Sequence, residues 1–126
     1  MRKFKKLFAG MMAMATLAVG MTGFSASAYT ASNSNSIFTW TKSGFSSTVK
    51  ITNTSGISRY AFCSNYHYSI SGAYLTHGSQ SKTISDGQYA SVSASANGTT
   101  SVVFNGGMYP SSTNNGPLLV SWTKSL

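Results

Sequence analysis

Cysteine and histidine are the side chains of this sequence that could ligate a transition metal or act as nucleophile and base. The chain has one Cys and two His, at Cys63, His67 and His77. Zinc and copper sites use thiolate and imidazole ligands, but the spacing here matches no established metal motif. Residues four apart in an extended strand lie about 13 Å from each other, too far for Cys63 to react with His67 as its base. The three residues are therefore weak metal candidates, and we expect neither a metal nor a cofactor.

The sequence contains a single acidic side chain, Asp86, and no Glu. Glycosidases usually act through a pair of carboxyl groups, and calcium or magnesium sites gather several. Asp86 precedes Gly87, which is typical of a tight turn, and no G-x-S-x-G sequence is present to carry a nucleophilic serine. These observations exclude carboxylate-dependent catalysis and predict a protein that is not an enzyme.

Aromatic side chains have the most functional potential, since the chain has seven Tyr and two Trp. Two interpretations are open. Either the rings fill a small core with their hydroxyl groups at its rim, or some form an exposed row that stacks on sugar rings or sits at a membrane interface. A long loop rich in Gly and Asn, residues 105–117, is also expected to expose its side chains. The candidate ligand-binding residues are Tyr66, Tyr68, Tyr74, Met108 and Tyr109.

Residues 1–28 have the three parts of a secretory signal peptide: a basic start, an apolar run over residues 7–21, and small residues before the cleavage site. The apolar run is shorter than the roughly 20 residues that a transmembrane helix needs. We expect cleavage after Ala28, a secreted extracellular protein and a bacterial source. No further transmembrane segment is expected in residues 29–126.

The formal net charge of the chain is +8, from nine basic residues and one acidic residue. Four of the basic residues belong to the predicted signal peptide, so the exported part carries a net charge of +4. Its basic residues are Lys42, Lys50, Arg59, Lys82 and Lys124. They are scattered singly, whereas binding to a phosphate backbone needs a cluster of basic residues. The sequence therefore predicts no nucleic-acid partner.

The pattern of the exported part predicts an all-β domain. Apolar and aromatic residues alternate with Ser and Thr in short runs bounded by Gly, Asn and Asp. We expect a flexible lead-in over residues 29–36 and a small antiparallel β-sandwich of about seven or eight short strands over residues 37–126. The expected strands are 37–42, 45–52, 57–70, 73–77, 80–84, 89–96, 99–105 and 118–124.

Two of these segments allow more specific predictions. In the run 57–70, alternation places the aromatic rings on one face and Cys63 and His67 on the other, with Ser64–Asn65 as a point where the strand could bend. Asn97–Gly98 favours a type I′ hairpin turn, so residues 80–105 are expected to form a three-stranded meander.

The odd cysteine of a secreted protein is a buried, inert thiol, a bridge to another chain or a reactive group. The sequence does not distinguish these states of Cys63, and a Cys63-linked dimer is one of the expected assemblies.

The segment Ser46–Gly56, SSTVKITNTSG, resembles the lactococcin-type bacteriocins, which are secreted β-sandwiches that act on the cell envelope. The resemblance covers this segment alone and carries no individual site residue across. It implies a bacteriocin-like, antimicrobial protein.

Three functions are therefore considered. The first is a secreted, non-enzymatic binding protein that acts on a component of a bacterial cell envelope. The second is a carbohydrate-binding domain, or an adhesion or extracellular-matrix domain. The third is a structural surface protein that assembles through its edge strands. The expected partners are a cell-wall polymer, an anionic lipid or a glycan.

Overall fold

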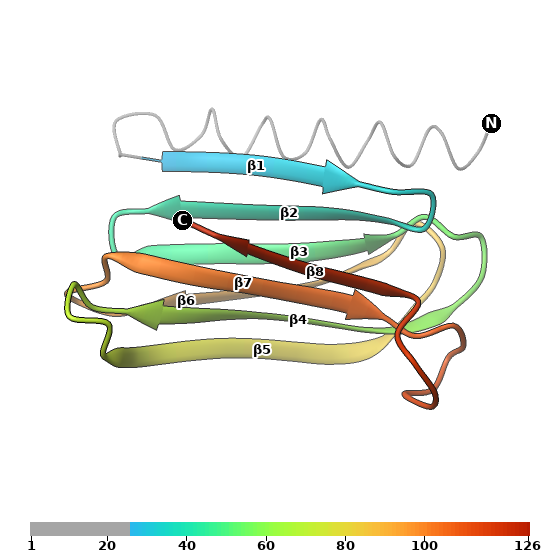
Figure 1. Cartoon of the computed structure of the whole chain (residues 1–126). Helices are drawn as coiled ribbons and strands as arrows, with labels where there is room; N and C mark the ends of the chain where they lie inside the picture. Colours follow the sequence, from blue (N-terminus) through green and yellow to red (C-terminus); the bar gives the residue numbers. More distant parts are fainter. Residues whose placement is uncertain (1–25) are drawn as a thin grey trace.

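The computed structural model of the protein describes residues 26–126, which form eight β-strands in two antiparallel sheets packed face to face (Figure 1). The predicted all-β sandwich is therefore confirmed. The strands are β1 (Ala26–Ser32), β2 (Ser36–Ser43), β3 (Ser46–Asn53), β4 (Arg59–Tyr68), β5 (Tyr74–Ile84), β6 (Tyr89–Ser95), β7 (Ser101–Met108) and β8 (Val120–Ser125). Over these residues, no helix has the length and apolar character needed to cross a membrane.

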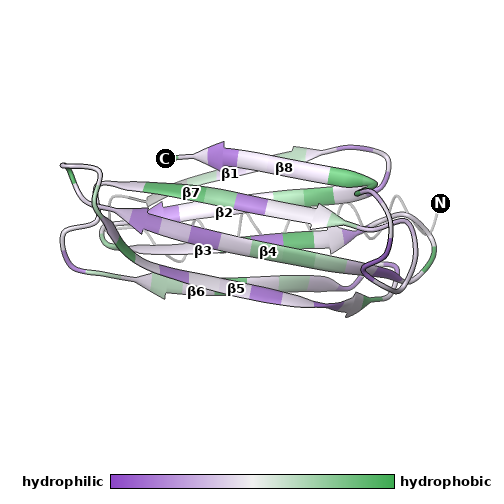
Figure 2. Ribbon diagram, turned by 60° about the horizontal axis from the view of Figure 1, so that its bottom comes forward, coloured by the Kyte–Doolittle hydropathy of each residue, from purple (hydrophilic) through white to green (hydrophobic). Residues whose placement is uncertain are grey.

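Sheet A has the strand order β1-β2-β3-β6, and sheet B has the order β5-β4-β7-β8. The inward faces of both sheets bury apolar side chains, and Figure 2 shows apolar stretches alternating with polar ones along the strands. The alternation that predicted the strands therefore reflects one face toward the core and one face outward. Large apolar side chains in the core include Phe38, Trp40, Ile51, Phe104 and Met108.

The two sheets approach each other closely where Phe38 of β2 faces Gly106 of β7. A Cβ atom at position 106 would lie 2.8 Å from Cδ1 of the Phe38 ring and would overlap the neighbouring ring carbon. Glycine is therefore required at this position by packing, because any side chain would push the two sheets apart.

Residues 80–105 do not form the predicted meander. β5 pairs with β4 in sheet B, β6 pairs with β3 in sheet A, and β7 pairs with β4 again. The chain thus changes sheet at each of these connections. At Asn97–Gly98 only the glycine has a positive φ, 87°, whereas a type I′ turn needs a positive φ at both residues. The Asn-Gly pair marks a turn but does not decide which sheet the next strand joins.

The predicted flexible lead-in over residues 29–36 is wrong, because residues 29–32 belong to β1 and pair with residues 37–40 of β2. Backbone hydrogen bonds hold this strand, and its small polar residues give no apolar alternation that could have predicted it. Residues 1–25 of the predicted signal peptide lie outside the described residues. The expected cleavage point after Ala28 falls within β1 and stays a prediction.

Three other boundaries differ from expectation. β4 continues without a bend through Ser64–Asn65, and β5 joins the expected segments 73–77 and 80–84 into one strand. The register between β4 and β5 shifts only between His67 and Tyr68. β7 pairs with β4 as far as Met108, so the loop that follows it begins at residue 109 and not at 105.

Candidate functional site

Strand β4 turns its aromatic face outward, away from the other sheet. The residues at its inward positions are buried, and they are Ala61, Cys63, Asn65 and His67. Aromatic side chains at its outward positions stay partly exposed, and they are Tyr60, Phe62, Tyr66 and Tyr68. The predicted alternation of this strand is confirmed. The smaller and more polar of its two faces is the one that enters the core.

A chain of hydrogen bonds allows the polar face of β4 to be buried. Asn65 Nδ2 donates to Ser47 Oγ at 2.7 Å, and the same oxygen lies 2.7 Å from Nε2 of His67. On the other side of the ring, His67 Nδ1 lies 2.9 Å from Thr99 Oγ1, whose hydroxyl donates to the carbonyl oxygen of Ala96 at 2.7 Å. In the described part of the chain, no buried side-chain nitrogen or oxygen lacks a partner. The polar residues of this core are therefore paired, as stable burial requires.

These contacts assign the tautomer of His67. The Thr99 hydroxyl already donates to a carbonyl group, so it accepts from Nδ1–H of His67. Nε2 then accepts from the Ser47 hydroxyl, and the imidazole is neutral. Burial lowers the pKa of His67, and the positive charge of Lys42 lowers it further. Both ring nitrogens have partners within the core, so His67 is a structural residue.

Four rings gather on the outer face of sheet B, and we call Tyr66, Tyr68, Tyr74 and His77 the tyrosine cluster. Tyr66 and His77 are paired across β4 and β5, and their rings are stacked with centroids 4.9 Å apart. The Tyr74 hydroxyl lies 2.5 Å from His77 Nδ1. Tyr74 also packs 6.5 Å from Tyr66 and, edge-on, 6.4 Å from Tyr68. Its side chain is 54% exposed, so the cluster presents ring surface to solvent.

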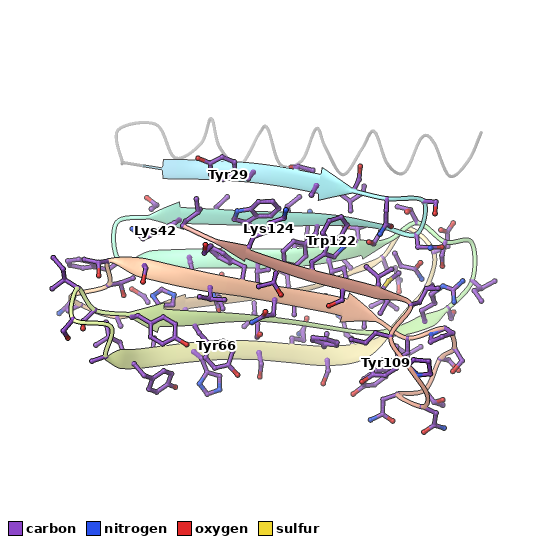
Figure 3. All side chains as sticks on the ribbon, viewed as in Figure 1. Tyr29, Lys42, Tyr66, Tyr109, Trp122 and Lys124 are labelled. Atoms are coloured by element: carbon purple, nitrogen blue, oxygen red, sulfur yellow. The ribbon has the colours of Figure 1, made fainter. Side chains whose placement is uncertain are left out.

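A second aromatic group, formed by Tyr60, Phe62 and Tyr109, lies toward the other end of the same sheet. Figure 3 shows this separation for Tyr66 and Tyr109. Tyr109 packs edge-on 5.9 Å from Tyr60 and 6.5 Å from Phe62. Phe62 is paired with Gly107, where a Cβ atom would lie 2.7 Å from its ring. The absence of a side chain at Gly107 lets the Phe62 ring lie against the backbone of β7.

Hydroxyl and amide side chains occupy the sheet between these two aromatic groups. Ser64 of β4 is paired with Ser79 of β5 and Asn105 of β7, and Thr123 of β8 donates to Asn105 Oδ1 at 3.1 Å. This polar strip separates the aromatic groups by about 13 Å along β4. Across the described strands of sheet B, no Lys, Arg, Asp or Glu occupies an outward position. The face is therefore aromatic and polar, and it lacks formal charge.

The structure brings together three of the five predicted ligand-binding residues. Tyr66, Tyr68 and Tyr74 meet in the tyrosine cluster, and Tyr109 lies on the same sheet in the second aromatic group. The expectation that a loop exposes Met108 is wrong. Met108 is fully buried, because it ends β7 and its pairing with Ala61 and Val120 places its side chain in the core.

The three weak metal candidates do not share a site. Cys63 and His67 point into the core from β4, whereas His77 lies on the outer face of sheet B. Among residues 26–126, no three His, Cys, Asp or Glu side chains lie close enough to hold a metal ion. His77 instead contributes a ring to the tyrosine cluster. The sequence alone did not suggest this role, because the partner of His77 across the sheet depends on the register of β4 and β5.

Cys63 is fully buried, with Sγ 4.0 Å from the carbonyl oxygen of Val49. Burial raises the pKa of its thiol to about 12, although the positive charge of Lys82 acts in the opposite direction. A sulfur atom in this position cannot reach a second chain. The structure therefore does not support the predicted Cys63-linked dimer.

No family model matches the sequence, and no curated protein matches it. Among solved structures, the chain is similar to a beta-glucuronidase from glycoside hydrolase family 2, with 11% sequence identity and a TM-score of 0.40. The similar part covers 84% of this chain and 11% of the enzyme, so the chain spans only a small part of its length. A similarity this low does not identify a function.

Proposed function

We propose that this protein is a secreted, non-enzymatic protein that binds a neutral glycan of a bacterial cell envelope through the tyrosine cluster. The observation that carries the proposal is the outward group formed by Tyr66, His77 and Tyr74 on a face without charged side chains. A sugar ring has an apolar side of C–H groups that packs on an aromatic ring, while its hydroxyl groups need hydrogen-bonding partners. The tyrosine hydroxyls, His77 and the neighbouring polar strip supply such partners.

The rings of the tyrosine cluster support one another before any ligand binds. Tyr66 is stacked on His77, and His77 is hydrogen-bonded to Tyr74. Two of these side chains come from neighbouring positions on paired strands, which are rigid elements. A surface that is already ordered loses little conformational freedom on binding, and this favours affinity for a ligand that offers only weak contacts.

The charge of this face favours a neutral ligand. Nucleic acids and anionic lipids are attracted by clustered basic side chains. The outward positions of sheet B in the described structure carry none. A sugar without formal charge needs only stacking and hydrogen bonds, which are the two kinds of contact that this face offers.

Other parts of the proposal rest on the sequence. The signal-peptide pattern is the reason for placing the protein outside the cell, and the single acidic residue is the reason for a non-enzymatic role. A protein released to bind the envelopes of neighbouring bacteria would be antimicrobial, as the bacteriocin resemblance implies. One that stays on the wall of its own cell would act in adhesion. Growth inhibition of neighbouring species by the purified protein distinguishes the two roles.

A glycan array tests the binding proposal directly. The chain, Tyr66→Ala, Tyr74→Ala and Tyr89→Ala are applied to the same array. Tyr89 is the matched control, because its side chain is 52% exposed and it lies on β6 of the other sheet. The chain is expected to bind one or more neutral glycans, and the first two variants are expected to lose this signal while the control retains it.

Salt is the second variable of this test. Stacking and neutral hydrogen bonds are little affected by ionic strength, so binding should persist from about 0.05 M to about 0.5 M salt. Equal signals from the chain and the Tyr66→Ala and Tyr74→Ala variants, or binding that salt abolishes, would contradict the proposal.

A further inference from the structure

A third group of aromatic rings lies at the opposite edge of the sandwich, where β1 and β2 of sheet A lie near β8 of sheet B. Tyr29 of β1 is paired with Trp40 of β2, and both rings are on the inward side of sheet A. Trp122 of β8 is paired with Gly106 and faces them from sheet B. Figure 3 shows Tyr29, Trp122 and Lys124 in this region. We call Tyr29, Trp40, Trp122, Lys42 and Lys124 the cation–aromatic edge.

The rings of the cation–aromatic edge are held in fixed positions. Tyr29 is stacked on Trp40 with centroids 5.8 Å apart, and Trp122 is stacked on Phe38 at 6.0 Å. Phe38 joins the two pairs through its contact with Trp40 at 5.5 Å. The indole nitrogen of Trp122 donates to Ser36 Oγ at 3.0 Å, which fixes the rotation of that ring. Tyr29 remains 47% exposed, and Trp122 is partly exposed, so ring surface is accessible here.

Two lysines place positive charge beside these rings. Lys124 Nζ lies 5.6 Å from the centroid of Trp40 and 5.9 Å from that of Trp122. Lys42 lies two residues beyond Trp40 on the same face of β2, about 7 Å further along the strand. The positive charge of Lys42 helps to lower the pKa of His67. Both lysines are only partly exposed, so their charges are less screened than those of fully solvated side chains.

No acidic side chain balances these two lysines. Asp86 is the only acidic residue of the chain, and it accepts from the backbone N–H of Gly56. The turn that contains Asp86 is hydrogen-bonded to Asn53, at the end of β3. Lys42 is paired with Ser47, near the start of β3, so six residues or about 20 Å of strand separate the two regions. No acidic side chain therefore offsets the charge of these two lysines, and an anionic ligand would complement it.

We propose that the cation–aromatic edge is a second binding site, which takes an acidic sugar unit that carries a carboxylate or a phosphate group. The ring of the sugar would pack on the exposed surface of Trp122 or of Tyr29, and its acidic group would face the ammonium group of Lys124, with Lys42 further along β2. This site is separate from the tyrosine cluster and goes beyond the proposed function, because it selects for charge. Together the two sites would let one domain contact neutral and acidic parts of an envelope polymer.

Intrinsic fluorescence tests this proposal, because Trp40 and Trp122 are the only two Trp residues of the chain and both lie at the site. The chain is titrated with three probes: oligogalacturonate for a carboxylate, polyglycerol phosphate for a phosphate, and cellohexaose as a neutral sugar. At least one acidic probe is expected to change the emission of the tryptophans, and added salt is expected to weaken that response. The acidic probe that responds identifies which group the site takes.

Lysine variants test whether the acidic probe binds beside Lys42 and Lys124. Lys42→Met and Lys124→Met keep an unbranched side chain of similar length and remove the charge, so each should weaken binding by about tenfold. Lys124→Arg should retain most of the affinity. Lys82→Met is the matched control, since Lys82 is an exposed lysine elsewhere in sheet B, and it should bind as the unchanged chain does.

Two results would overturn the proposal. One is a tryptophan emission that neither acidic probe changes. The other is equal affinity of Lys42→Met, Lys124→Met and Lys82→Met for the same probe. The Tyr66→Ala variant tests the two proposals independently. Loss of the tyrosine cluster should leave the tryptophan response to an acidic probe unchanged, even if it abolishes binding of a neutral glycan.

Discussion

At the scale of single residues, the buried imidazole of His67 links the stability of the sandwich to pH. His67 accepts from Ser47 and donates to Thr99, so its ring is neutral in the folded chain. Burial and Lys42 hold its pKa below the ordinary value of about 6.5. The unfolded chain therefore takes up a proton at a higher pH than the folded chain does. Stability is full above about pH 6.5 and is lost as the pH falls below that value.

We predict that the free energy of unfolding falls by up to about 1.4 kcal/mol per pH unit below about pH 6.5, down to the lowered pKa of His67. Denaturant unfolding at several values between about pH 5 and pH 8 measures this slope. The His67→Gln variant, which cannot be protonated, should be less stable but should lose the slope. His77→Asn, on the outer face, should retain it. A slope that survives in His67→Gln would show that another group is responsible.

Cys63 gives a prediction about reactivity. With a pKa raised to about 12, the thiol of the folded chain is almost entirely protonated at pH 8. The folded protein should therefore resist alkylation by iodoacetamide and should react rapidly once it is unfolded in denaturant. Mass spectrometry of the alkylated chain measures the rates, and a non-reducing gel should show only monomer. Rapid alkylation of the folded protein, or a dimer band that a reductant removes, would contradict the buried position of the thiol.

At the scale of the strands, β4 shows what alternation can and cannot predict. The separation of its aromatic face from the face with Cys63 and His67 followed from period-two spacing alone. The choice of the inward face did not, since Tyr and Phe rings are at least as apolar as the residues that are buried. That choice depends on Ser47 and Thr99, which come from distant parts of the chain and give Asn65 and His67 their hydrogen bonds. Such partners cannot be read from β4 itself.

Packing between the strands leads to a prediction for Gly106. An added methyl group in Gly106→Ala would overlap the Phe38 ring, so this variant should be destabilised by about 1–3 kcal/mol. Ser101→Ala, at an exposed position of the same strand, should change the stability by no more than about 0.5 kcal/mol. Thermal or denaturant unfolding measures both. Combining Gly106→Ala with Phe38→Leu should recover part of the loss, and an unchanged stability in Gly106→Ala would mean that the sheets are less closely packed here.

The order of strands in the two sheets was the part of the fold that the sequence did not predict. Turn residues such as Asn97 and Gly98 mark where a strand ends, and the run that follows was correctly identified as a strand. Pairing of β6 with β3, and of β7 with β4, joins residues that are far apart in the chain. Long-range pairing depends on how all the strands compete for partners. The spacing of residues within one strand does not contain this information.

At the scale of the whole molecule, the two proposed sites lie on different parts of the sandwich and differ in charge. The tyrosine cluster lies on the outer face of sheet B, and the cation–aromatic edge lies between β2 and β8. The sequence predicted Tyr66, Tyr68 and Tyr74 as binding residues because of their type. It could not show that His77 joins them, or that Lys124 lies beside both tryptophans. Those groupings depend on strand register and on the packing of one sheet against the other.

Binding of a neutral glycan should involve the outer face of sheet B. Backbone amide chemical shifts, measured by NMR during titration with the neutral glycan that binds best on the array, locate the bound glycan on the sandwich. We expect the largest shifts at Tyr66, Tyr74 and His77 and no change in the Tyr89 region of sheet A. Shifts confined to sheet A or to the region of Lys42, or their persistence in the Tyr66→Ala variant, would contradict this expectation.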